Sequence, residues 1–366
     1  MIVCVPVAVI VAMQASAQQP PPRIVSARLS QRGVDLVLRL RTDAVHPLRD
    51  GVLLCARRLS TTERPVADVC VRRSRGSRPL LELRRLAPDS AAVSKRRLRG
   101  SIHVGKSSVS ATFRAGDAGM RTGKLRWQAL SVRAGQRCAA SARCESRLPA
   151  NGYFTFELRR VAGCAASGRS FRRTGPGRDR RVALTFDDGP SSVTPSVLNV
   201  LDRMHVRATF FIVGVHVRGH TRLFRHMLAH GNAIGNHSLA HDLRPGAADL
   251  KRTSALINRA TGYEPCLFRA PYGDLGGGAI GNARKLGMLT IGWNDDPSDW
   301  ASPGASAIAA RVLNQAKPGS IVLMHDGGGP RGQTAAALPT IVAGLRRRGY
   351  DSVTVPELLR LAPRYR

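Results

Sequence analysis

The chain has 366 residues, of which 57 are Lys or Arg and 24 are Asp or Glu, so its formal net charge is +33. Its length is typical of two domains, and a hydrophobic content of 43% excludes a wholly disordered chain. The positive charge is spread over both halves of the chain and aromatic residues make up only 5%, so a dedicated nucleic-acid site, with focused charge and interleaved aromatics, is not favoured.

The N-terminus predicts an export signal. Residues 1–17 are largely apolar and uncharged and end in Ala15-Ser16-Ala17, the small-x-small pattern of a signal-peptide cleavage site. The apolar run from Ile2 to Met13 is too short for a typical membrane span. Because no Lys or Arg precedes it, an uncleaved membrane anchor stays open as the alternative. We expect an exported protein, either secreted or associated with the cell wall or membrane.

Six cysteines follow residue 17, an even number that is consistent with disulfides in an exported chain. None of them has the Cys-x-x-Cys spacing of a zinc or redox site. Free buried thiols are the alternative. Proximity along the sequence favours three pairs: Cys55 with Cys70, Cys138 with Cys144 and, as the remaining two, Cys164 with Cys266.

Residues 18–160 contain short segments in which apolar and polar residues alternate with a period of two. These segments are 34–41, 101–104, 108–114, 125–132 and 153–158. The pattern predicts an all-β, sandwich-like accessory domain of unknown role, because no catalytic constellation is visible in it. Residues 161–180, rich in Gly, Ser and Arg, predict a linker or surface loop.

From residue 181 to residue 362, short apolar runs alternate with amphipathic stretches, the pattern of repeated βα units. The expected strands are 182–186, 208–213, 233–235, 267–269, 289–293, 321–324 and 352–355. The expected helices are 195–204, 221–230, 247–261, 304–316 and 334–348. The fold class is therefore α/β with a parallel sheet, either open and doubly wound or closed into a (β/α) barrel.

Polar residues gather where these strands end, which is where parallel α/β folds place their active sites. Histidines four residues apart on a helical turn, such as His237 and His241, can reach one ion. With Asp188 as a third ligand and one open position, they form the layout of a catalytic divalent-metal site, and the adjacent Asp187 could accept a proton from water. The alternatives are a pair of surface histidines and an Asp-Gly-Pro turn that caps a helix.

Further candidates follow the later strands. Arg269 could fix the charge and orientation of an active-site carboxylate, or be one ordinary arginine among 51. His325 could be a general acid whose tautomer is fixed by Asp299, or a satisfied core histidine. Trp300 offers a flat apolar wall to a ligand, although a tryptophan alone is as easily a core residue.

Together and in this order, the segments TFDDGP, NHSLAH, RAPYG, DPSDW and LMH resemble the five motifs of the NodB-homology polysaccharide deacetylases, carbohydrate esterase family 4. The resemblance covers residues 180–360, about half of the chain. It implies a distorted (β/α) barrel, often of seven strands. It also implies a hydrolase that releases acetate from the N-acetyl groups of an N-acetylglucosamine glycan, either peptidoglycan or chitin-like. An O-acetyl xylan esterase, or a non-catalytic module that binds glycan or another anionic polymer, is the alternative.

The resemblance also implies a role for each matched position. These roles are a catalytic base at Asp187 with its partner Arg269, metal ligands at Asp188, His237 and His241, an oxyanion-hole N–H at Tyr272, a general acid at His325 supported by Asp299, and an acetate pocket lined by Trp300 and Leu323. One departure is visible, because the Arg that many family members carry shortly after the Asp-Trp pair is missing here.

The expected cofactor is a divalent metal. Zn²⁺ comes first because two nitrogen ligands and one carboxylate suit it, and Co²⁺ or Ni²⁺ would fit the same set. The expected partners are an acetylated polysaccharide and, given the basic surface, acidic cell-wall polymers. No specific nucleic acid is expected, and the sequence does not predict an oligomeric state.

Overall fold

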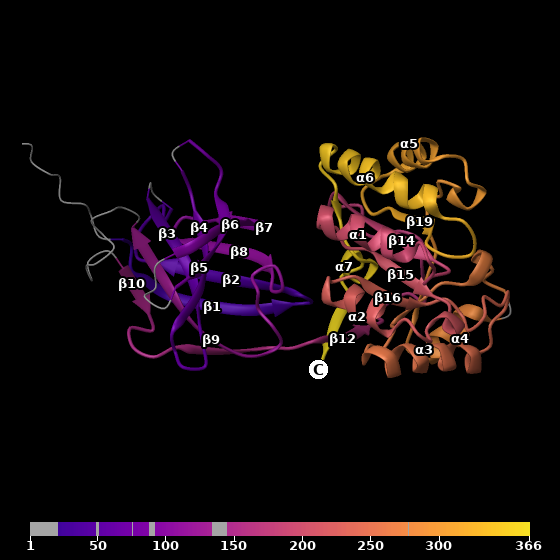
Figure 1. Ribbon diagram of the computed structural model, residues 1–366, viewed down its shortest axis with the longest axis horizontal. Helices are drawn as coiled ribbons and strands as arrows, with labels where there is room; N and C mark the ends of the chain where they lie inside the picture. Colours follow the sequence, from indigo (N-terminus) through magenta and orange to yellow (C-terminus); the bar gives the residue numbers. More distant parts are fainter. Residues whose placement is uncertain (1–20, 49–50, 75, 88–91, 134–144, 277) are drawn as a thin grey trace, which may run out of the picture. The chain divides into compact units, whose positions relative to one another are not determined.

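The computed structural model describes residues 21–48, 51–74, 76–87, 92–133, 145–276 and 278–366. The chain divides into two compact units, and the main boundary along the sequence is between Glu157 and Leu158. Of the described residues, the first unit contains those in 21–31 and 35–157, and the second contains those in 32–34 and 158–366. Figure 1 shows strands in the first unit and a mixture of strands and helices in the second. Residues 1–17, the predicted signal, lie outside the described residues.

The described part of the first unit folds into two antiparallel sheets. One has the order β1-β2-β8-β7, and the other has the order β10-β9-β3-β4-β5-β6, with β11 also paired to β9. The strands are β1 Ile24–Arg32, β2 Asp35–Thr42, β3 Val52–Leu59, β4 Pro65–Arg72, β5 Leu80–Leu86, β6 Ala92–Leu98, β7 Gly100–Val104, β8 Ser108–Arg114, β9 Gly123–Arg133, β10 Glu145–Leu148 and β11 Phe154–Leu158.

The alternation seen in the sequence accounts for the strands that were predicted. Leu36, Leu38 and Leu40 of β2 are at most 1% exposed, while Arg39 and Arg41 between and beside them are exposed, as a strand with one buried face requires. Strands β3 and β4 were not predicted, because seven of the eight residues of β3 and five consecutive residues of β4 are buried, which removes the period of two. Sandwich packing and an accessory role for this unit stay predictions.

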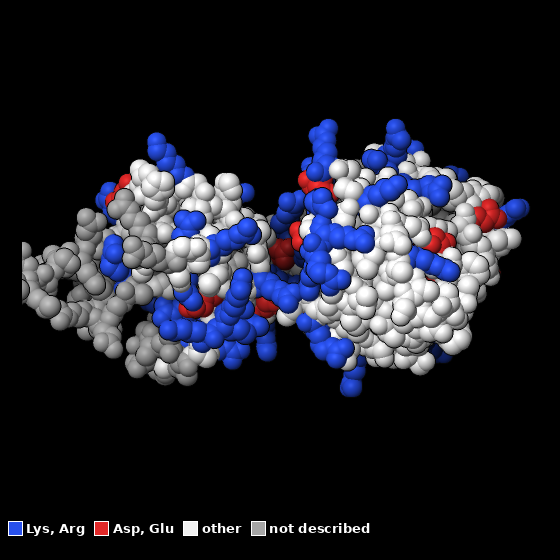
Figure 2. All heavy atoms as spheres, turned by 90° about the horizontal axis from the view of Figure 1, so that it is seen from above, with Lys and Arg blue, Asp and Glu red and all other residues white. Residues whose placement is uncertain are grey.

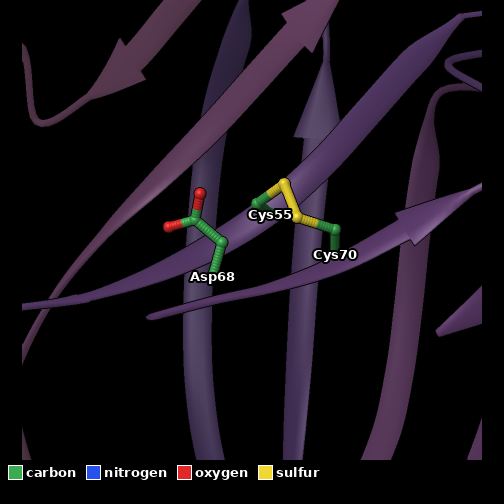
Figure 3. A group of neighbouring side chains, drawn as sticks. All are labelled: Cys55, Asp68 and Cys70. Atoms are coloured by element: carbon green, nitrogen blue, oxygen red, sulfur yellow. A yellow bond between two sulfur atoms is a disulfide. The ribbon is translucent and has the colours of Figure 1, made fainter. Parts of the chain in front are cut away.

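A disulfide joins β3 and β4 in this unit. Cys55 and Cys70 are directly opposite each other in the antiparallel ladder and form one of the predicted bonds. Asp68 lies beside them (Figure 3), but its carboxylate accepts hydrogen bonds from Nε and Nη2 of Arg57 at 2.9 and 3.0 Å. Since both sulfurs are bonded to each other and the carboxylate is paired, this Cys-Asp-Cys group has no free ligand for a metal.

The second unit is built on a curled parallel sheet with the strand order β13-β18-β17-β16-β15-β14-β19, to which β20 adds beside β14. Its parallel strands are β14 Arg181–Asp187, β15 Thr209–Ile212, β16 Ala233–Asn236, β17 Leu267–Phe268, β18 Leu289–Ile291, β19 Ile321–His325 and β20 Asp351–Ser352. All seven predicted strands are present. An isolated bridge from Asp295, just past β18, to Val322 of β19 brings the two sides of the curl together.

Both faces of this sheet are buried, and alternate residues supply the two cores. Val182, Leu184 and Phe186 of β14 belong to the larger cluster, which also holds residues of α1, α2 and α6. Ala183 and Phe211, from β14 and β15, belong to a second cluster inside the curl. Strands buried on both faces read as continuous apolar runs, which explains why these segments lack an alternating pattern.

The helices follow the expected amphipathic stretches closely. They are α1 Thr194–Met204, α2 Thr221–Ala229, α3 Ala247–Thr261, α4 Ala279–Lys285, α5 Ala305–Gln315, α6 Gly332–Arg347 and α7 Val355–Leu358. The short α4 and α7 were not predicted, and α7 takes the last residue of a segment that we expected to be a strand. Thr354 explains this difference, because it forms a capping box with Glu357 that starts a helix. Among the described residues, none of the helices combines the length and apolar character that a membrane crossing needs.

The segment 161–180, which we expected to be a linker or surface loop, instead belongs to the second unit. Its β12 (Val161–Ala165) pairs antiparallel with β21 (Ala362–Tyr365) at the chain's end, and its β13 (Phe171–Arg172) pairs parallel with β18. The sequence did not indicate these strands, because their small and basic residues show almost no alternation of apolar and polar positions. Cys164 of β12 forms the predicted disulfide with Cys266. The predicted Cys138–Cys144 pair lies outside the described residues.

Candidate active site

Four strands of the curled sheet have polar residues at or just after their carboxyl ends. Asp187 ends β14, His237 follows β16, Arg269 follows β17 and His325 ends β19. Because β14 and β19 are parallel and in register, Asp187 and His325 are directly opposite each other. Strands that are far apart in the sequence thus place their last residues around one point.

Asp188, His237 and His241 converge as predicted. Oδ1 of Asp188 is 3.2 Å from Nε2 of His237 and 3.1 Å from Nε2 of His241, and the ligand atoms of all three side chains lie within 4.8 Å of one another. Burial would raise the pKa of Asp188, but the hydrogen bonds and positive charge of the two imidazoles in their protonated form hold that pKa well below its usual range. The carboxylate is therefore an anion that faces two nitrogens.

The protonation of His237 shows that this group fits a metal ion. Nδ1 of His237 is 2.8 Å from the carbonyl oxygen of Arg269; a carbonyl only accepts, so Nδ1 carries the proton and Nε2 presents a lone pair. Oδ1 of Asp188 is buried without a hydrogen-bond donor. Two lone pairs that face each other in a buried site call for a cation between them.

The local backbone differs from the helical turn that we expected for the two histidines. Residues 237–241 form a loop in which Ser238 and His241 have φ values of 64° and 65°. Oδ1 of Asn236 accepts a hydrogen bond from the Ser238 N–H, and Oγ of Ser238 accepts one from the Asp242 N–H. These side chains replace helical hydrogen bonds, and the left-handed residues turn both rings towards Asp188.

Asp187 is held by a fully buried arginine. Nη1 of Arg269 donates to Oδ1 of Asp187 at 2.8 Å and to Oγ1 of Thr185 at 2.7 Å, and the guanidinium lies 4.2 Å from the centre of the Phe211 ring. Burial lowers the pKa of Arg269, and the charge of Asp187 opposes that effect. The other carboxylate oxygen, Oδ2, is 3.9 Å from Nε2 of His237. Asp187 therefore presents one oxygen to the arginine and the other to the predicted metal position.

His325 is paired with Asp299 on the other side of the site. Nδ1 of His325 is 2.8 Å from Oδ1 of Asp299, and the other carboxylate oxygen accepts hydrogen bonds from the His325 N–H and from Oγ1 of Thr334. Burial of the ring alone would lower its pKa, but the hydrogen bond and charge of Asp299, followed by the charges of Asp187 and Asp188, raise the pKa of His325 overall. The arrangement leaves Nε2 to face a ligand.

The predicted pocket residues are placed around these polar groups with different exposures. Leu323, in β19, is 5% exposed, whereas Tyr272 and Trp300 are 71% and 56% exposed. Tyr272 lies in a short 3₁₀ turn with φ 57° and its ring stands edge-on to that of His241, with 4.5 Å between centroids. Exposure of two large aromatic rings is unfavourable in water, so these rings suit contact with a ligand.

Three buried residues that the sequence analysis missed support this site. Thr185 and Thr334 donate or accept the hydrogen bonds described above, and threonines within apolar or helical segments carry no pattern that would single them out. Asp326 follows His325, and its burial raises its pKa to about 7. A hydrogen bond from Thr194 lowers this pKa, and the charges of Asp187 and Asp188 raise it. In the sequence, only the position of Asp326 directly after His325 indicated that it lies near the site.

A carboxylate and two imidazoles arranged for a cation, beside a carboxylate base and a carboxylate-supported imidazole, form the set expected of a hydrolase that uses a divalent ion. The comparisons with known proteins define the family. A family model described as "Polysaccharide deacetylase" matches residues 174–291. The peptidoglycan-N-acetylglucosamine deacetylase of Bacillus cereus is 39% identical over 193 residues, which cover 50% of this chain and 91% of that protein.

A further relative agrees with this assignment, and one solved structure is reported beside it. The chitooligosaccharide deacetylase of a Bradyrhizobium species is 37% identical over 198 residues, covering 49% of this chain and 90% of that protein. A crystal structure of a peptidoglycan N-acetylglucosamine deacetylase is 31% identical, covers 52% of this chain and 93% of that chain, and has a TM-score of 0.49. The chain belongs to the polysaccharide deacetylases with a NodB homology domain, carbohydrate esterase family 4. The predictions of this family and of an enzyme of its hydrolase class are confirmed.

Proposed function

We propose that the chain is an exported, metal-dependent polysaccharide deacetylase that releases acetate from N-acetylglucosamine units of a glycan, with peptidoglycan as the first candidate and a chitin-like glycan as the second. The observation that carries this proposal is the convergence of Asp188, His237 and His241 beside the Arg269–Asp187 pair. The relatives named for peptidoglycan and chitooligosaccharides support the choice of an amide of an amino sugar over an ester.

The residues divide the hydrolysis between them. A divalent ion held by Asp188, His237 and His241 would polarise the acetyl oxygen and make water more acidic. Oδ2 of Asp187 takes the proton of the attacking water, because the hydrogen bond from Arg269 to Oδ1 fixes the direction of this carboxylate. The backbone N–H of Tyr272 donates to the oxygen that becomes negative. Nε2 of His325 then protonates the leaving nitrogen, and acetate departs.

Zn²⁺ is the metal that we propose first, since two imidazoles and one carboxylate suit it, and Co²⁺ or Ni²⁺ would fit the same donors. Trp300 and Leu323 would line the space for the acetyl methyl group. This role needs an apolar surface at the mouth of the site, and the exposure of Trp300 is consistent with it.

Acetate release from the purified chain tests the function. We expect release from peptidoglycan and chitin oligomers to exceed release from acetylxylan, and to stop after exhaustive chelation and return on addition of Zn²⁺. A preference for acetylxylan would support the esterase alternative. Undiminished release after chelation would contradict the metal-dependent mechanism, and glycan binding without any release would support a non-catalytic module.

The pH profile tests the pairing of His325 with Asp299. The general acid must be protonated, so activity is expected to fall as the pH rises through the raised pKa of His325. Asp299→Asn removes the charge and the carboxylate partner that raise this pKa. The alkaline limb of the kcat profile should therefore move to lower pH, together with a lower plateau. An alkaline limb that stays in place in this variant would contradict the role of Asp299.

For the first unit and for the surface charge, we propose a supporting role. Basic side chains are visible on both units and outnumber acidic ones (Figure 2), which favours attraction to acidic wall polymers. We propose that the first unit contributes to wall attachment or substrate positioning. Such binding would weaken with added salt, which distinguishes it from recognition of the acetyl group by the active site.

A further inference from the structure

A second group of one aspartate and two histidines lies apart from the active site. Asp202 is in the last turn of α1, His226 is in the last turn of α2, and His230 is the C-cap of α2. The ligand atoms of these three side chains lie within 4.8 Å of one another. The hydrolysis described above uses none of them.

The topology puts this group at the opposite edge of the sheet from the active site. The chain leaves α1 and α2 at their carboxyl ends and soon enters β15 at Thr209 and β16 at Ala233, so the group adjoins the amino ends of those strands. The catalytic residues lie at the carboxyl ends of the strands. The second group is therefore not an extension of the first.

The donor atoms of the group converge. His226 and His230 are four residues apart, so their rings share one face of the helix, with 4.0 Å between ring centroids. Nδ1 of His230 is 2.9 Å from the carbonyl oxygen of His226; it must donate there, which leaves the lone pair on Nε2 free. Nε2 of His226 is 2.6 Å from Oδ2 of Asp202. Two imidazoles and one carboxylate oxygen thus face a common point.

The local field also favours a cation. The carboxyl end of a helix carries partial negative charge, and the group joins the ends of two helices. An anionic Asp202 is unfavourably placed at such an end, although Arg203 in the same turn offsets part of its charge. A bound cation would be stabilised by both helix ends and by the carboxylate.

We propose that Asp202, His226 and His230 bind one divalent transition-metal ion, with Zn²⁺ as the probe, and that the ion cross-links α1 to α2. Ligand distances of about 2.0–2.2 Å require the Asp202–His226 contact to open by roughly 0.6 Å from its present hydrogen bond, and the proton between Nε2 and Oδ2 is released to solvent as the ion binds. The side chains of Asp202 and His226 are 24% and 42% exposed, so they can move by this amount and water can complete the coordination.

Metal content of the full-length chain tests this proposal. After chelation and dialysis against Zn²⁺ at about pH 7.5, where imidazoles are neutral, the unaltered chain should hold about two ions. The His226→Ala/His230→Ala variant should hold about one, and so should the Asp188→Asn/His237→Ala variant, which loses the catalytic ligands. Zn²⁺ should also raise the melting temperature of the second variant. As a matched control, His103→Ala, at an exposed position of β7, should hold two.

The outcomes are distinct from those for the proposed function. Equal zinc content in the unaltered chain and in His226→Ala/His230→Ala would overturn the second site, as would a complete loss of zinc in Asp188→Asn/His237→Ala. If the double alanine variant is poorly folded, Asp202→Asn provides the same test with a smaller change, and circular dichroism of the metal-free chain verifies its fold. A chain that releases no acetate but still holds the second ion would leave this inference standing.

Discussion

Asp187→Asn is expected to lower kcat for acetate release by about 10²–10⁴-fold, the usual contribution of a general base, while zinc still binds. The amide keeps the size of the carboxylate and can still accept a hydrogen bond from Arg269, but it cannot take a proton from water. The proposed metal ligands are left unchanged, since Asp187 contributes none of them. Steady-state kinetics and metal analysis of the same sample measure both quantities.

The matched control for this variant is Asp351→Asn. Asp351 is an exposed residue of β20, which pairs with the amino end of β14, away from the catalytic edge. We expect kcat to stay unchanged in this control. Two results would contradict the base role of Asp187: activity of Asp187→Asn close to that of the unaltered chain, or loss of the metal together with the activity.

Arg269→Met is expected to destabilise the second unit by about 3–5 kcal/mol, because it leaves the buried carboxylate of Asp187 without its counter-charge. The arginine is fully buried and also donates to the carbonyl oxygens of Ile291 and Gly292 and to Thr185. Methionine fills much of the same volume, so the loss arises mainly from charge and hydrogen bonds rather than from a cavity. Denaturant unfolding monitored by fluorescence measures the change.

A double variant separates the charge effect from the loss of packing. In Arg269→Met/Asp187→Asn no buried charge is left unpaired, so the double variant should be more stable than Arg269→Met alone. Arg222→Met, an exposed position on α2, is the control and should change stability by at most about 0.5 kcal/mol. If Arg269→Met unfolds no more easily than this control, the ion pair does not stabilise the site in the way described here.

The sequence predicted the second unit more fully than the first for a physical reason. Strands such as β14 and β15 are buried on both faces, so they stand out as apolar runs between helical stretches. The first unit mixes strands with one buried face, such as β2, with strands that are buried throughout, such as β3. Only the former carry a period of two. Of the eleven strands in the described residues of this unit, five matched a predicted segment.

At the site, the sequence identified residue types and spacing but not the backbone that brings them together. A separation of four residues suggested a helix for His237 and His241, whereas left-handed residues at Ser238 and His241 bring the rings together in a loop. Asp188 and Tyr272 also have positive φ values, 70° and 57°. Such conformations at residues other than glycine depend on the surrounding fold, so local sequence does not reveal them. The support from Thr185 and Thr334 likewise depends on contacts between distant segments.

The pairing of β12 with β21 has a consequence for how this catalytic unit combines with other segments. β12, near the start of this unit, is hydrogen-bonded to β21, its last strand, with Val161 opposite Tyr365. The two ends of the unit therefore lie side by side. A folded module with adjacent ends can be inserted into a loop of another domain or circularly permuted without stretching those ends. A module excised at residue 181 would lose this strand and the Cys164–Cys266 bond, whereas one excised at Leu158 would keep both.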